Sequence, residues 1–324
     1  MLFRSRGRAL AVAAAEQAVS RAGLTLPQDS GVFIGSTIGE SMAFERAAEG
    51  AAIDLADYGV PSFTAGIRRR FALNGPQQSL ATACAAGNYA VGAALSALRQ
   101  GRCTVALAGG AEPFSRLSLM GFSRSRAMAS NGCRPFDAQR DGMSLGEGAA
   151  MFVMELAEAA LQRGATPLAE VVSLGLSCDA YHPTAPQPEG VGMRAAMQAA
   201  LDAAGITPAD IDWINAHGSG TRASDAAEAK ALSALFGDAM PAVSGSKGAL
   251  GHALGAASAI ELAVCVLGLD HQTVPPTRGH WEPEPDGGIA CTRMPLARRL
   301  RWALNNAFAF GGVNSALLLR TWAA

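Results

Sequence analysis

Residues 84–110 read CAAGNYAVGAALSALRQGRCTVALAGG, and this stretch carries the strongest signal of the fold. Cys84 to Arg99 is rich in alanine and contains no proline, which predicts a helix. After Gly101, Thr104 to Gly110 is a short apolar run of the kind that forms a buried strand, and Gly31 to Ser36 has the same character. A helix between two buried parallel strands predicts an α/β fold.

The same alternation continues along the chain. Further helices are predicted from Ala9 to Ala22, Ala157 to Arg163, Val191 to Ala204, Ser224 to Leu235 and Gly255 to Leu269. Further strands are predicted at Gly148 to Leu156, Ala169 to Ser177, Ile211 to Ala216, Gly288 to Arg293 and Phe310 to Leu319. The halves 1–160 and 161–324 are therefore expected to be two α/β units of similar plan. Because no proline- or serine-rich linker separates them, we expect packed layers of one body.

Composition excludes several classes of protein. The chain has 324 residues, 49% of them hydrophobic and 16% charged, which excludes a disordered tail or a small disulfide-stapled domain. A net charge of -1 gives no reason to expect nucleic acid or an anionic membrane as a partner. The six cysteines form no C-x-x-C pair, so neither a disulfide framework nor a zinc ribbon is indicated. We expect no metal site and no cofactor. Reduced thiols indicate a cytoplasmic protein.

The N-terminus has a superficial likeness to a secretory signal. Met1 to Arg8 carries three arginines, and the apolar stretch Ala9 to Ala15 follows. That stretch is mostly alanine, and Glu16 and Arg21 continue a helical pattern up to Gly23, a suitable C-terminal cap. An ordinary amphipathic helix is the favoured interpretation. No apolar run approaches the ~18 residues that a membrane-spanning helix needs.

Cys84 is the first candidate for chemistry. It lies among small residues, directly before the alanine-rich helix. A thiol at a helix N-terminus faces the positive end of the helix dipole, which lowers its pKa, and unpaired N–H groups there can stabilise an oxyanion. The alternative is a buried, inert cysteine. Cys103, Cys133, Cys178, Cys265 and Cys291 have no such context.

His217 is the second candidate. It lies in Asn215-Ala-His-Gly-Ser-Gly-Thr221, immediately after a predicted strand. Sites in α/β sheets form at the carboxyl ends of strands, and the flanking glycines permit a sharp turn that exposes the imidazole. A histidine that merely caps a turn remains the alternative. The glycine spacing matches neither phosphate-loop pattern.

Lys247 and His252 share the segment Ser244-Gly-Ser-Lys-Gly-Ala-Leu-Gly-His-Ala-Leu-Gly-Ala-Ala257, which precedes an apolar helix carrying Glu261. Only two of the 26 basic residues are lysines, and one of them lies among these glycines. This favours a role for a compact ammonium beside a backbone turn, over an ordinary surface lysine. Glu261 needs a buried partner, which Lys247 or a backbone amide could supply.

Two further motifs are interpreted as architectural. Residues 134–148, RPFDAQRDGMSLGEG, are rich in charges that can pair. Residues 305–314, NNAFAFGGVN, form a glycine turn entering a strand. In the second motif, the N–H beside Phe310 could complete an oxyanion hole and the ring could close a pocket.

With these five segments in this order, the chain resembles the elongating Cys-His-His group of β-ketoacyl-acyl-carrier-protein synthases, within the thiolase-like family. The resemblance covers residues 7–320 and rests on TACAAG, RPFDxxRDG with GEG, NAHGxGT, SKGxxGHxxGAA and FxFGGxN. It implies a layered αβαβα fold, a homodimer or a heterodimer with another ketosynthase, and acyl carrier protein as partner. The implied reaction is decarboxylative Claisen condensation with malonyl thioester, in fatty acid or polyketide-like biosynthesis.

The resemblance also implies roles for single residues. Cys84 is the expected nucleophile that accepts the acyl chain, and His217 and His252 are expected to bind the malonyl thioester and assist decarboxylation. Lys247 and Glu261 are expected to maintain electrostatics and geometry. The N–H groups of Cys84 and Phe310 are the expected oxyanion hole, and the Phe310 ring the gate of the acyl pocket. Thr221 and Gly311 are expected supporting residues.

The sequence departs from the family pattern at several positions. Ser219, Ser224 and Ala309 replace the usual Thr, Asn and Gly, and Ala309 adds a methyl group at the gate. The chain also opens at what resembles the family's second major helix, without the first strand, the following helix and a neighbouring strand. We expect a missing central strand to expose a sheet edge.

Three alternatives remain open on the sequence alone. The first is a non-catalytic or weakly active partner subunit of a ketosynthase heterodimer, similar to a chain-length factor, although such subunits typically replace the cysteine. The second is a degenerate fragment without function. The third is a thiolase or acyl-CoA transferase, for which the family would place a second catalytic cysteine near the C-terminus; Cys291 lacks the glycine context for that role.

Overall fold

The computed structural model describes residues 5–52, 58–285 and 287–322, which form two compact units. Unit 1 comprises residues 1–121, 147–167 and 253–260, and unit 2 comprises residues 122–146, 168–252 and 261–324. Each unit is therefore assembled from three separate stretches of sequence, whereas a single division between residues 160 and 161 was expected. Residues 1–4, which belong to the signal-like stretch, lie outside the described residues.

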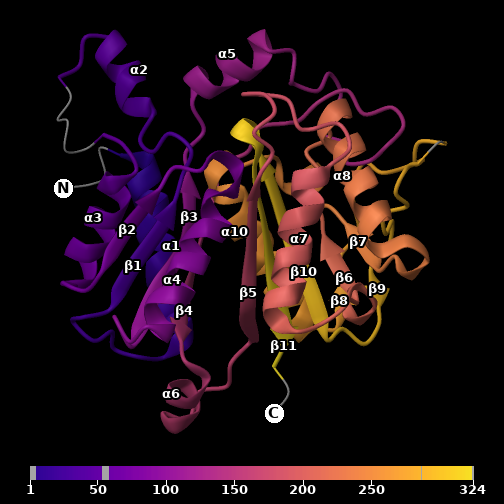
Figure 1. The fold of residues 1–324 in the computed structure, drawn as a ribbon. Helices are drawn as coiled ribbons and strands as arrows, with labels where there is room; N and C mark the ends of the chain where they lie inside the picture. Colours follow the sequence, from indigo (N-terminus) through magenta and orange to yellow (C-terminus); the bar gives the residue numbers. More distant parts are fainter. Residues whose placement is uncertain (1–4, 53–57, 286, 323–324) are drawn as a thin grey trace. The chain divides into compact units, whose positions relative to one another are not determined.

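Unit 1 is built on a four-stranded sheet in the order β2, β1, β3, β4 (Figure 1). The strands are β1 (Gly31–Gly35), β2 (Gln77–Leu80), β3 (Val105–Glu112) and β4 (Gly148–Glu155). Strand β1 is parallel to β2 and β3, and β4 is antiparallel to β3. The parallel arrangement predicted for β1 and β3 is confirmed. Strand β2 was not predicted, because its sequence QQSL offers only one apolar residue.

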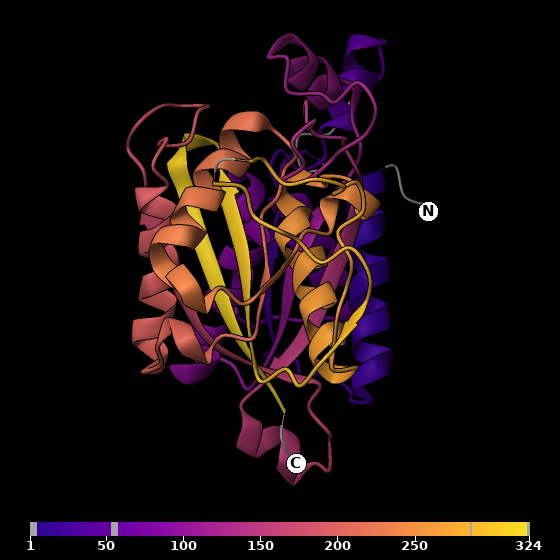
Figure 2. The same cartoon turned by 90° about the vertical axis from the view of Figure 1, so that its right-hand side faces the viewer.

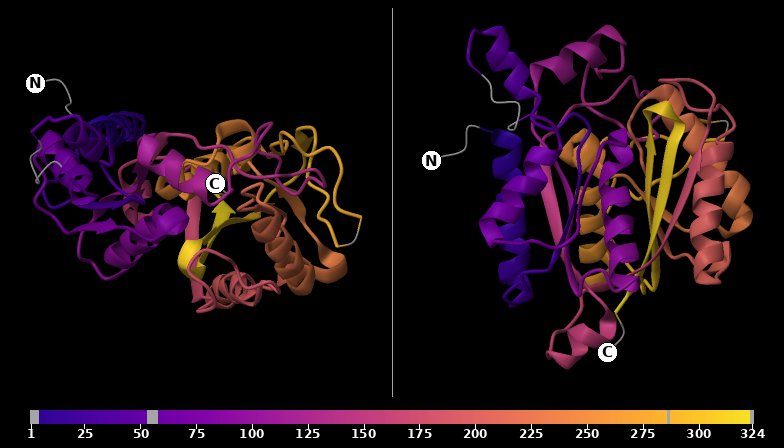
Figure 3. Two further views of the ribbon diagram at one scale, coloured as in Figure 1. Left: turned by 90° about the horizontal axis from the view of Figure 1, so that it is seen from above. Right: turned by 60° about the vertical axis from the view of Figure 1, so that its left-hand side comes forward.

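Helices cover both faces of this sheet. The helices assigned wholly to unit 1 are α1 (Arg6–Ala22), α2 (Met42–Ala48), α3 (Pro61–Phe71), α4 (Ala86–Arg99) and α6 (Ala157–Gln162), with the 3₁₀-helices η2 (Ala83–Ala85) and η5 (Leu254–Ala256). Helices α1 and α3 lie side by side and bury alternate strand residues, among them Val32 and Ile34 (Figure 3). Helix α4 packs against the same strands and takes the other face. Gly23, with φ 62°, ends α1 as predicted.

Unit 2 is built on a five-stranded sheet in the order β5, β11, β10, β6, β7. The strands are β5 (Ala169–Cys178), β6 (Trp213–Asn215), β7 (Ala242–Ser244), β10 (Trp302–Ala309) and β11 (Val313–Thr321). Strands β10, β6 and β7 run parallel, and β11 is antiparallel to both β10 and β5. A separate pair consists of β8 (Thr273–Val274) and β9 (Leu296–Ala297).

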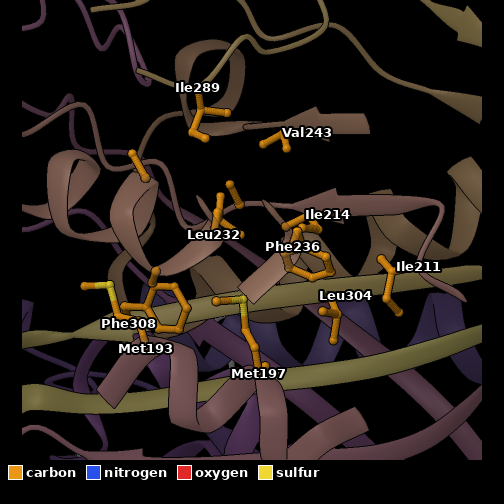
Figure 4. Close-up of a cluster of buried hydrophobic side chains, with 14 of the residues drawn as sticks. Met193, Met197, Ile211, Ile214, Leu232, Phe236, Val243, Ile289, Leu304 and Phe308 are labelled. Carbon is orange, nitrogen blue, oxygen red and sulfur yellow. The ribbon is translucent and has the colours of Figure 1, made fainter. Parts of the chain in front are cut away.

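The helices of unit 2 enclose its sheet. They are α7 (Val191–Ala204), α8 (Arg222–Phe236) and α9 (Lys247–Leu250), with η3 (Pro208–Asp210), η4 (Gly237–Ala239) and η6 (Phe310–Gly312). Helices α5 (Arg116–Arg124) and α10 (Ala257–Asp270) each begin in unit 1 and continue into unit 2. Figure 2 shows β10 and β11 between α7 and α8 on one side and α10 on the other. The core under α7 and α8 contains Met193, Met197, Leu232, Leu304 and Phe308 (Figure 4). None of the described helices is long and apolar enough to cross a membrane.

Two predictions about strands need correction. Residues 288–293 form no strand: Ile289 and Cys291 are buried, but the Cys291 N–H donates to the His280 ring instead of a neighbouring strand. The next strand of the five-stranded sheet along the chain is β10, at Trp302–Ala309. It was not predicted, because two asparagines interrupt its apolar residues. The second correction concerns the expected loss of a central strand. The four strands of the unit 1 sheet are paired without interruption, and β4 is an edge strand of that sheet.

Candidate active site

The cysteines differ sharply in accessibility. Cys103, Cys133, Cys265 and Cys291 are buried, and burial raises the pKa of each thiol, that of Cys133 to about 12. Such thiols stay protonated and react poorly. Only Cys84, which is half-buried, and Cys178, which is exposed, can meet a substrate or reagent. Cys178 is the last residue of β5.

In unit 1, Cys84 occupies the short 3₁₀ turn η2 that leads directly into α4. The preceding residue, Ala83, has φ 48°, a left-handed conformation that is uncommon for a residue with a side chain. Strained positions of this kind concentrate at functional sites. The start of α4 is also firmly held, because the Asn88 N–H donates to Ser258 Oγ over 3.0 Å. The sequence thus predicted the setting of Cys84 correctly, at the N-terminal end of a helix.

In unit 2, His217 lies in a loop that follows β6, as predicted. The loop is held by Glu228 of α8, whose carboxylate accepts hydrogen bonds from the His217 N–H over 2.8 Å and the Gly218 N–H over 2.9 Å. Gly218 and Gly220 have positive φ angles, so the loop turns where glycine costs least. Thr221 ends the loop and is the N-cap residue of α8. The backbone that carries the imidazole is therefore held in place by Glu228.

Lys247 is almost completely buried, which excludes the surface-lysine interpretation. Its Nζ donates to Glu261 Oε1 and to the His217 carbonyl, both over 2.6 Å. Ser246 Oγ also donates to Glu261 Oε1. The partner expected for Glu261 is thus Lys247. Because the ammonium bonds the His217 carbonyl, the pair also fixes the loop that carries the imidazole.

His252 lies beside His217 in the same unit. The two ring centroids are 5.5 Å apart with the rings at 76°. The backbone of His252 is fixed by the stretch before β4, since its N–H donates to Ser144 O and its carbonyl accepts from the Gly146 N–H. Phe308 packs on the other imidazole, with its ring centroid 6.2 Å from that of His217. The structure therefore brings His217, His252, Lys247 and Glu261 together in unit 2, while Cys84 belongs to unit 1.

The electrostatics keep both imidazoles neutral. Burial lowers the pKa of His217 and of His252 well below 6.5, and the positive charge of Lys247 lowers both further. Burial raises the pKa of Glu261 against the opposing effect of Lys247. Neutral imidazoles can donate hydrogen bonds to a developing oxyanion without carrying a charge that would quench it by protonation.

The Phe310 turn lies at the end of β10. Phe310 is 41% exposed, and its ring centroid lies 5.9 Å from that of Phe122. Gly311 has φ 81°, and its N–H donates to the Pro183 carbonyl over 2.8 Å. Ala309, by contrast, is in an extended conformation that any residue adopts, so its backbone has no need of glycine.

Sequence reasoning missed the acidic residues of α8 that organise the His217 loop. Asp225 accepts from the Phe136 and Gly220 N–H groups and lies 3.7 Å from the Arg140 guanidinium. Burial raises the pKa of Asp225 to about 6 and that of Glu228 to about 7. The available signal was their spacing, three residues apart on a helix whose remaining buried residues are alanine, leucine and phenylalanine.

The buried histidines predict a loss of stability in mild acid. Burial lowers the folded-state pKa of His217, His252 and His280, so below pH ~6.5 the unfolded chain binds protons that the folded chain does not. We expect His280→Gln to reduce the slope of unfolding free energy against pH, between pH 6.5 and 5.5, by up to ~1.4 kcal/mol per unit. Urea unfolding at several pH values measures this slope.

His271→Gln is the matched control, because His271 is exposed. It should leave the slope unchanged. The raised pKa values of Asp225 and Glu228 affect the slope in the opposite direction, because at these carboxyls the folded chain binds the extra proton. The slope of each variant is therefore compared with that of wild type. Equal slopes for His280→Gln and wild type would contradict the prediction.

Two family models cover most of the chain. "Beta-ketoacyl synthase, N-terminal domain" matches residues 4–160, and "Beta-ketoacyl synthase, C-terminal domain" matches residues 168–280. Nodulation protein E of Rhizobium meliloti (strain 1021) is 39% identical over 328 residues, which are 96% of this chain and 81% of the relative. A 3-oxoacyl-[acyl-carrier-protein] synthase 2 of the same organism is 39% identical, over 96% of this chain and 80% of the relative.

Solved structures agree with these relatives. The ishigamide ketosynthase/chain length factor has a TM-score of 0.92 and 40% identity, covering 98% of this chain and 83% of that chain. A β-ketoacyl synthase from Burkholderia phymatum STM815 has a TM-score of 0.91 and 32% identity, covering 98% and 83%. The predicted thiolase-like α/β fold is confirmed by these matches. The chain belongs to the β-ketoacyl synthase family, and its activity is that of a condensing acyltransferase in fatty acid or polyketide biosynthesis.

Proposed function

We propose that the protein catalyses decarboxylative condensation of an acyl chain on Cys84 with a malonyl thioester carried by acyl carrier protein. The observation that carries this proposal is the pair of buried, neutral imidazoles of His217 and His252, of which His217 lies on a backbone held by Lys247 and Glu228. In the first step the Cys84 thiolate attacks the acyl thioester carbonyl, and the carrier thiol leaves. The accessibility of Cys84 and its place before α4 support this role.

In the second step the bond between the malonyl α-carbon and its carboxylate breaks, and its electron pair forms an enolate as CO2 leaves. His217 and His252 donate hydrogen bonds to the enolate oxygen. The enolate carbon then attacks the acyl carbonyl, a carbon–carbon bond forms, and the Cys84 thiolate leaves. The N–H groups of Cys84 and Phe310 remain the predicted oxyanion donors, Phe310 the predicted gate, and Thr221 and Gly311 predicted supports.

The related structures support a proposal about the binding partners of this chain. One solved neighbour is described as a type II polyketide acyl carrier protein in complex with its ketosynthase, and two others pair a ketosynthase with a chain length factor. We therefore infer that this chain works on acyl carrier protein substrates, as a homodimer or paired with a second ketosynthase-like chain, in the cytoplasm.

The decisive experiment is intact-protein mass spectrometry after mixing the protein with acyl carrier protein thioesters of several chain lengths. A covalent acyl adduct is expected on wild type and on Cys178→Ala, but not on Cys84→Ala. Release of CO2 with malonyl carrier protein should follow. A folded protein that forms no adduct would instead favour a non-catalytic partner subunit.

Carrier recognition gives a second prediction. Arg124 and Arg126 are both exposed in unit 2, and acyl carrier protein is acidic. We expect Arg124→Glu with Arg126→Glu to raise KM for carrier-bound substrates roughly tenfold while leaving kcat nearly unchanged, because the charges steer and hold the encounter. Steady-state kinetics at two salt concentrations measure this effect.

The control for this prediction is Arg298→Glu with Arg299→Glu, which makes the same change of net charge at other exposed positions. It should leave KM within about twofold. An equal rise of KM in both double variants would show a general charge effect and remove the specific role of Arg124 and Arg126.

A further inference from the structure

Unit 1 contains an almost completely buried carboxylate that the proposed reaction steps leave without a role. Glu112 is the last residue of β3 and is 1% exposed. Its Oε2 accepts hydrogen bonds from the Thr37 N–H over 2.5 Å and the Gly255 N–H over 3.0 Å, and its Oε1 accepts from the Ile38 N–H over 3.3 Å. One carboxylate therefore holds two backbone segments of unit 1 that are far apart in the sequence.

The partners of Glu112 show what its site requires. Burial raises the pKa of Glu112, against the opposing effect of the three N–H groups. Backbone N–H groups donate hydrogen bonds and cannot accept them, so this site requires oxygen acceptors. Without them, buried N–H groups would lose their hydrogen bonds, which destabilises the segments that carry them. The role of Glu112 is therefore to hold backbone in place.

The Gly255 side of this contact leads to Cys84. Gly255 belongs to the 3₁₀ turn η5, which packs directly against η2, the turn that carries Cys84. Each turn contains a residue other than glycine with a left-handed backbone, Ala83 with φ 48° in η2 and Leu254 with φ 45° in η5. Such conformations persist only where the surroundings impose them. The packing of η5 on η2 is one such constraint, so the conformation of the Cys84 turn depends on how firmly η5 is held.

Two further contacts complete the support of η5. A Cβ on Gly255 would lie 2.2 Å from the Thr37 nitrogen, so glycine is needed for the close approach that Glu112 secures. Just after η5, Ser258 Oγ accepts the Asn88 N–H over 3.0 Å, which ties the start of α10 to the first turn of α4. A continuous series of contacts within unit 1 thus leads from Glu112 through η5 to the helix that Cys84 precedes.

We propose that Glu112 is a positioning residue of the condensation reaction: by holding Gly255 it keeps η5 packed on η2, and so fixes the Cys84 thiol at the N-terminal end of α4. This assignment rests on the role of Cys84 proposed above. A thiol that moves away from a helix N-terminus loses the N–H groups that stabilise its thiolate and the developing oxyanion. A displacement of about 1 Å is enough to lower a rate roughly 100-fold.

The first test compares Glu112→Met with Glu112→Gln in a Cys178→Ala background, in which Cys84 is the accessible thiol. Methionine has similar length but is only a weak acceptor, whereas glutamine keeps one oxygen and loses the charge. We expect alkylation by iodoacetamide at pH 7 to slow at least about threefold in Glu112→Met, and to stay within about twofold of the background in Glu112→Gln. The midpoint of alkylation against pH should rise only in Glu112→Met.

The pH dependence separates positioning from two other roles of Glu112. If its negative charge acted directly on the thiol, removal of the charge would lower the midpoint in both variants. If Glu112 only filled space, Glu112→Met would match the background. Either result overturns the proposal. Alkylation needs no acyl carrier protein, so this test stays decisive for positioning even if Cys84 accepts no acyl chain.

Acyl transfer from acyl carrier protein to Cys84 gives a second readout. In Glu112→Met we expect kcat to fall about tenfold or more with KM within about twofold, because a buried residue leaves the surface that meets the carrier unchanged. Glu45→Met is the matched control for alkylation. Glu45 also accepts backbone N–H groups in unit 1, those of Arg116 and Leu117, but at the contact of α2 with α5. Its replacement should leave the alkylation rate within about twofold.

A second variant tests the proposal independently of whether Glu112→Met folds. Ser258→Ala removes the acceptor of the Asn88 N–H with the loss of a single oxygen atom. It should slow alkylation of Cys84 about twofold, whereas Ser96→Ala, in the last turn of α4, should not. The double variant with Glu112→Met should be no slower than Glu112→Met alone, because both changes loosen the same support. An unchanged rate in Ser258→Ala, or effects that multiply in the double variant, would overturn the proposed route through η5.

Discussion

Replacing Cys84 by alanine is expected to abolish the acyl adduct and to lower the condensation rate by roughly 10³-fold or more. The physical reason is that the Cys84 thiolate forms the covalent intermediate at the start of α4, whereas Cys178, the other accessible thiol, lies at the end of β5. The four buried cysteines have raised pKa values and remain protonated. The measurement is single-turnover formation of the β-ketoacyl product, with the mass of the enzyme followed in parallel.

Cys178→Ala is the matched control for this variant. Cys178 is the one exposed thiol, and its Sγ lies 3.7 Å from the Gly311 carbonyl. Alkylation should modify Cys84 and Cys178 in wild type, yet only the loss of Cys84 should remove activity. Decarboxylation of malonyl carrier protein should persist in Cys84→Ala, because the histidines do not depend on the thiol. Full condensation activity in Cys84→Ala would disprove the assignment.

Local sequence patterns were sufficient to predict the settings of the main site residues. Cys84 precedes an alanine-rich helix and His217 follows an apolar strand, and both settings depend on neighbours in sequence. The partner of Glu261 could also be anticipated, since a carboxylate on an apolar helix must be compensated where it is buried. These predictions needed only short-range order and the cost of burying a charge.

Features decided by tertiary packing could not be predicted in this way. Glu228 and Asp225 resemble ordinary charges on an amphipathic helix until the loop from His217 to Gly220 supplies N–H donors to them. Strand β10 contains Asn305, whose Oδ1 accepts a hydrogen bond from Asn215 Nδ2 within the sheet. A pattern based on hydrophobicity assigns such polar residues to the surface.

The short strands were missed for a related reason. Strands β2 and β7 have four and three residues, too few for any periodic pattern. They exist because a neighbouring strand pairs with them, β1 in unit 1 and β6 in unit 2. The edge position of β4 was equally hidden, since the order of strands in a sheet is not written in any single strand.

Replacing Lys247 by methionine is expected to cost about 3–5 kcal/mol of unfolding free energy. The change leaves the buried Glu261 carboxylate without its cation and the His217 carbonyl without its donor. Methionine has similar length, so loss of packing contributes little. Lys230→Met is the matched control, because Lys230, the second lysine of the chain, is half-exposed and paired with the exposed Glu189; it should cost no more than ~1 kcal/mol.

The double variant Lys247→Met with Glu261→Gln separates stability from catalysis. Removing both charges should restore most of the unfolding free energy, because no unpaired charge remains buried. Decarboxylation of malonyl carrier protein should stay low, since the His217 carbonyl still lacks the ammonium that fixes its loop. Urea unfolding and CO2 release measure the two effects independently. If the double variant regains both, Lys247 only neutralises Glu261; if stability returns alone, the ammonium positions the imidazole for the reaction.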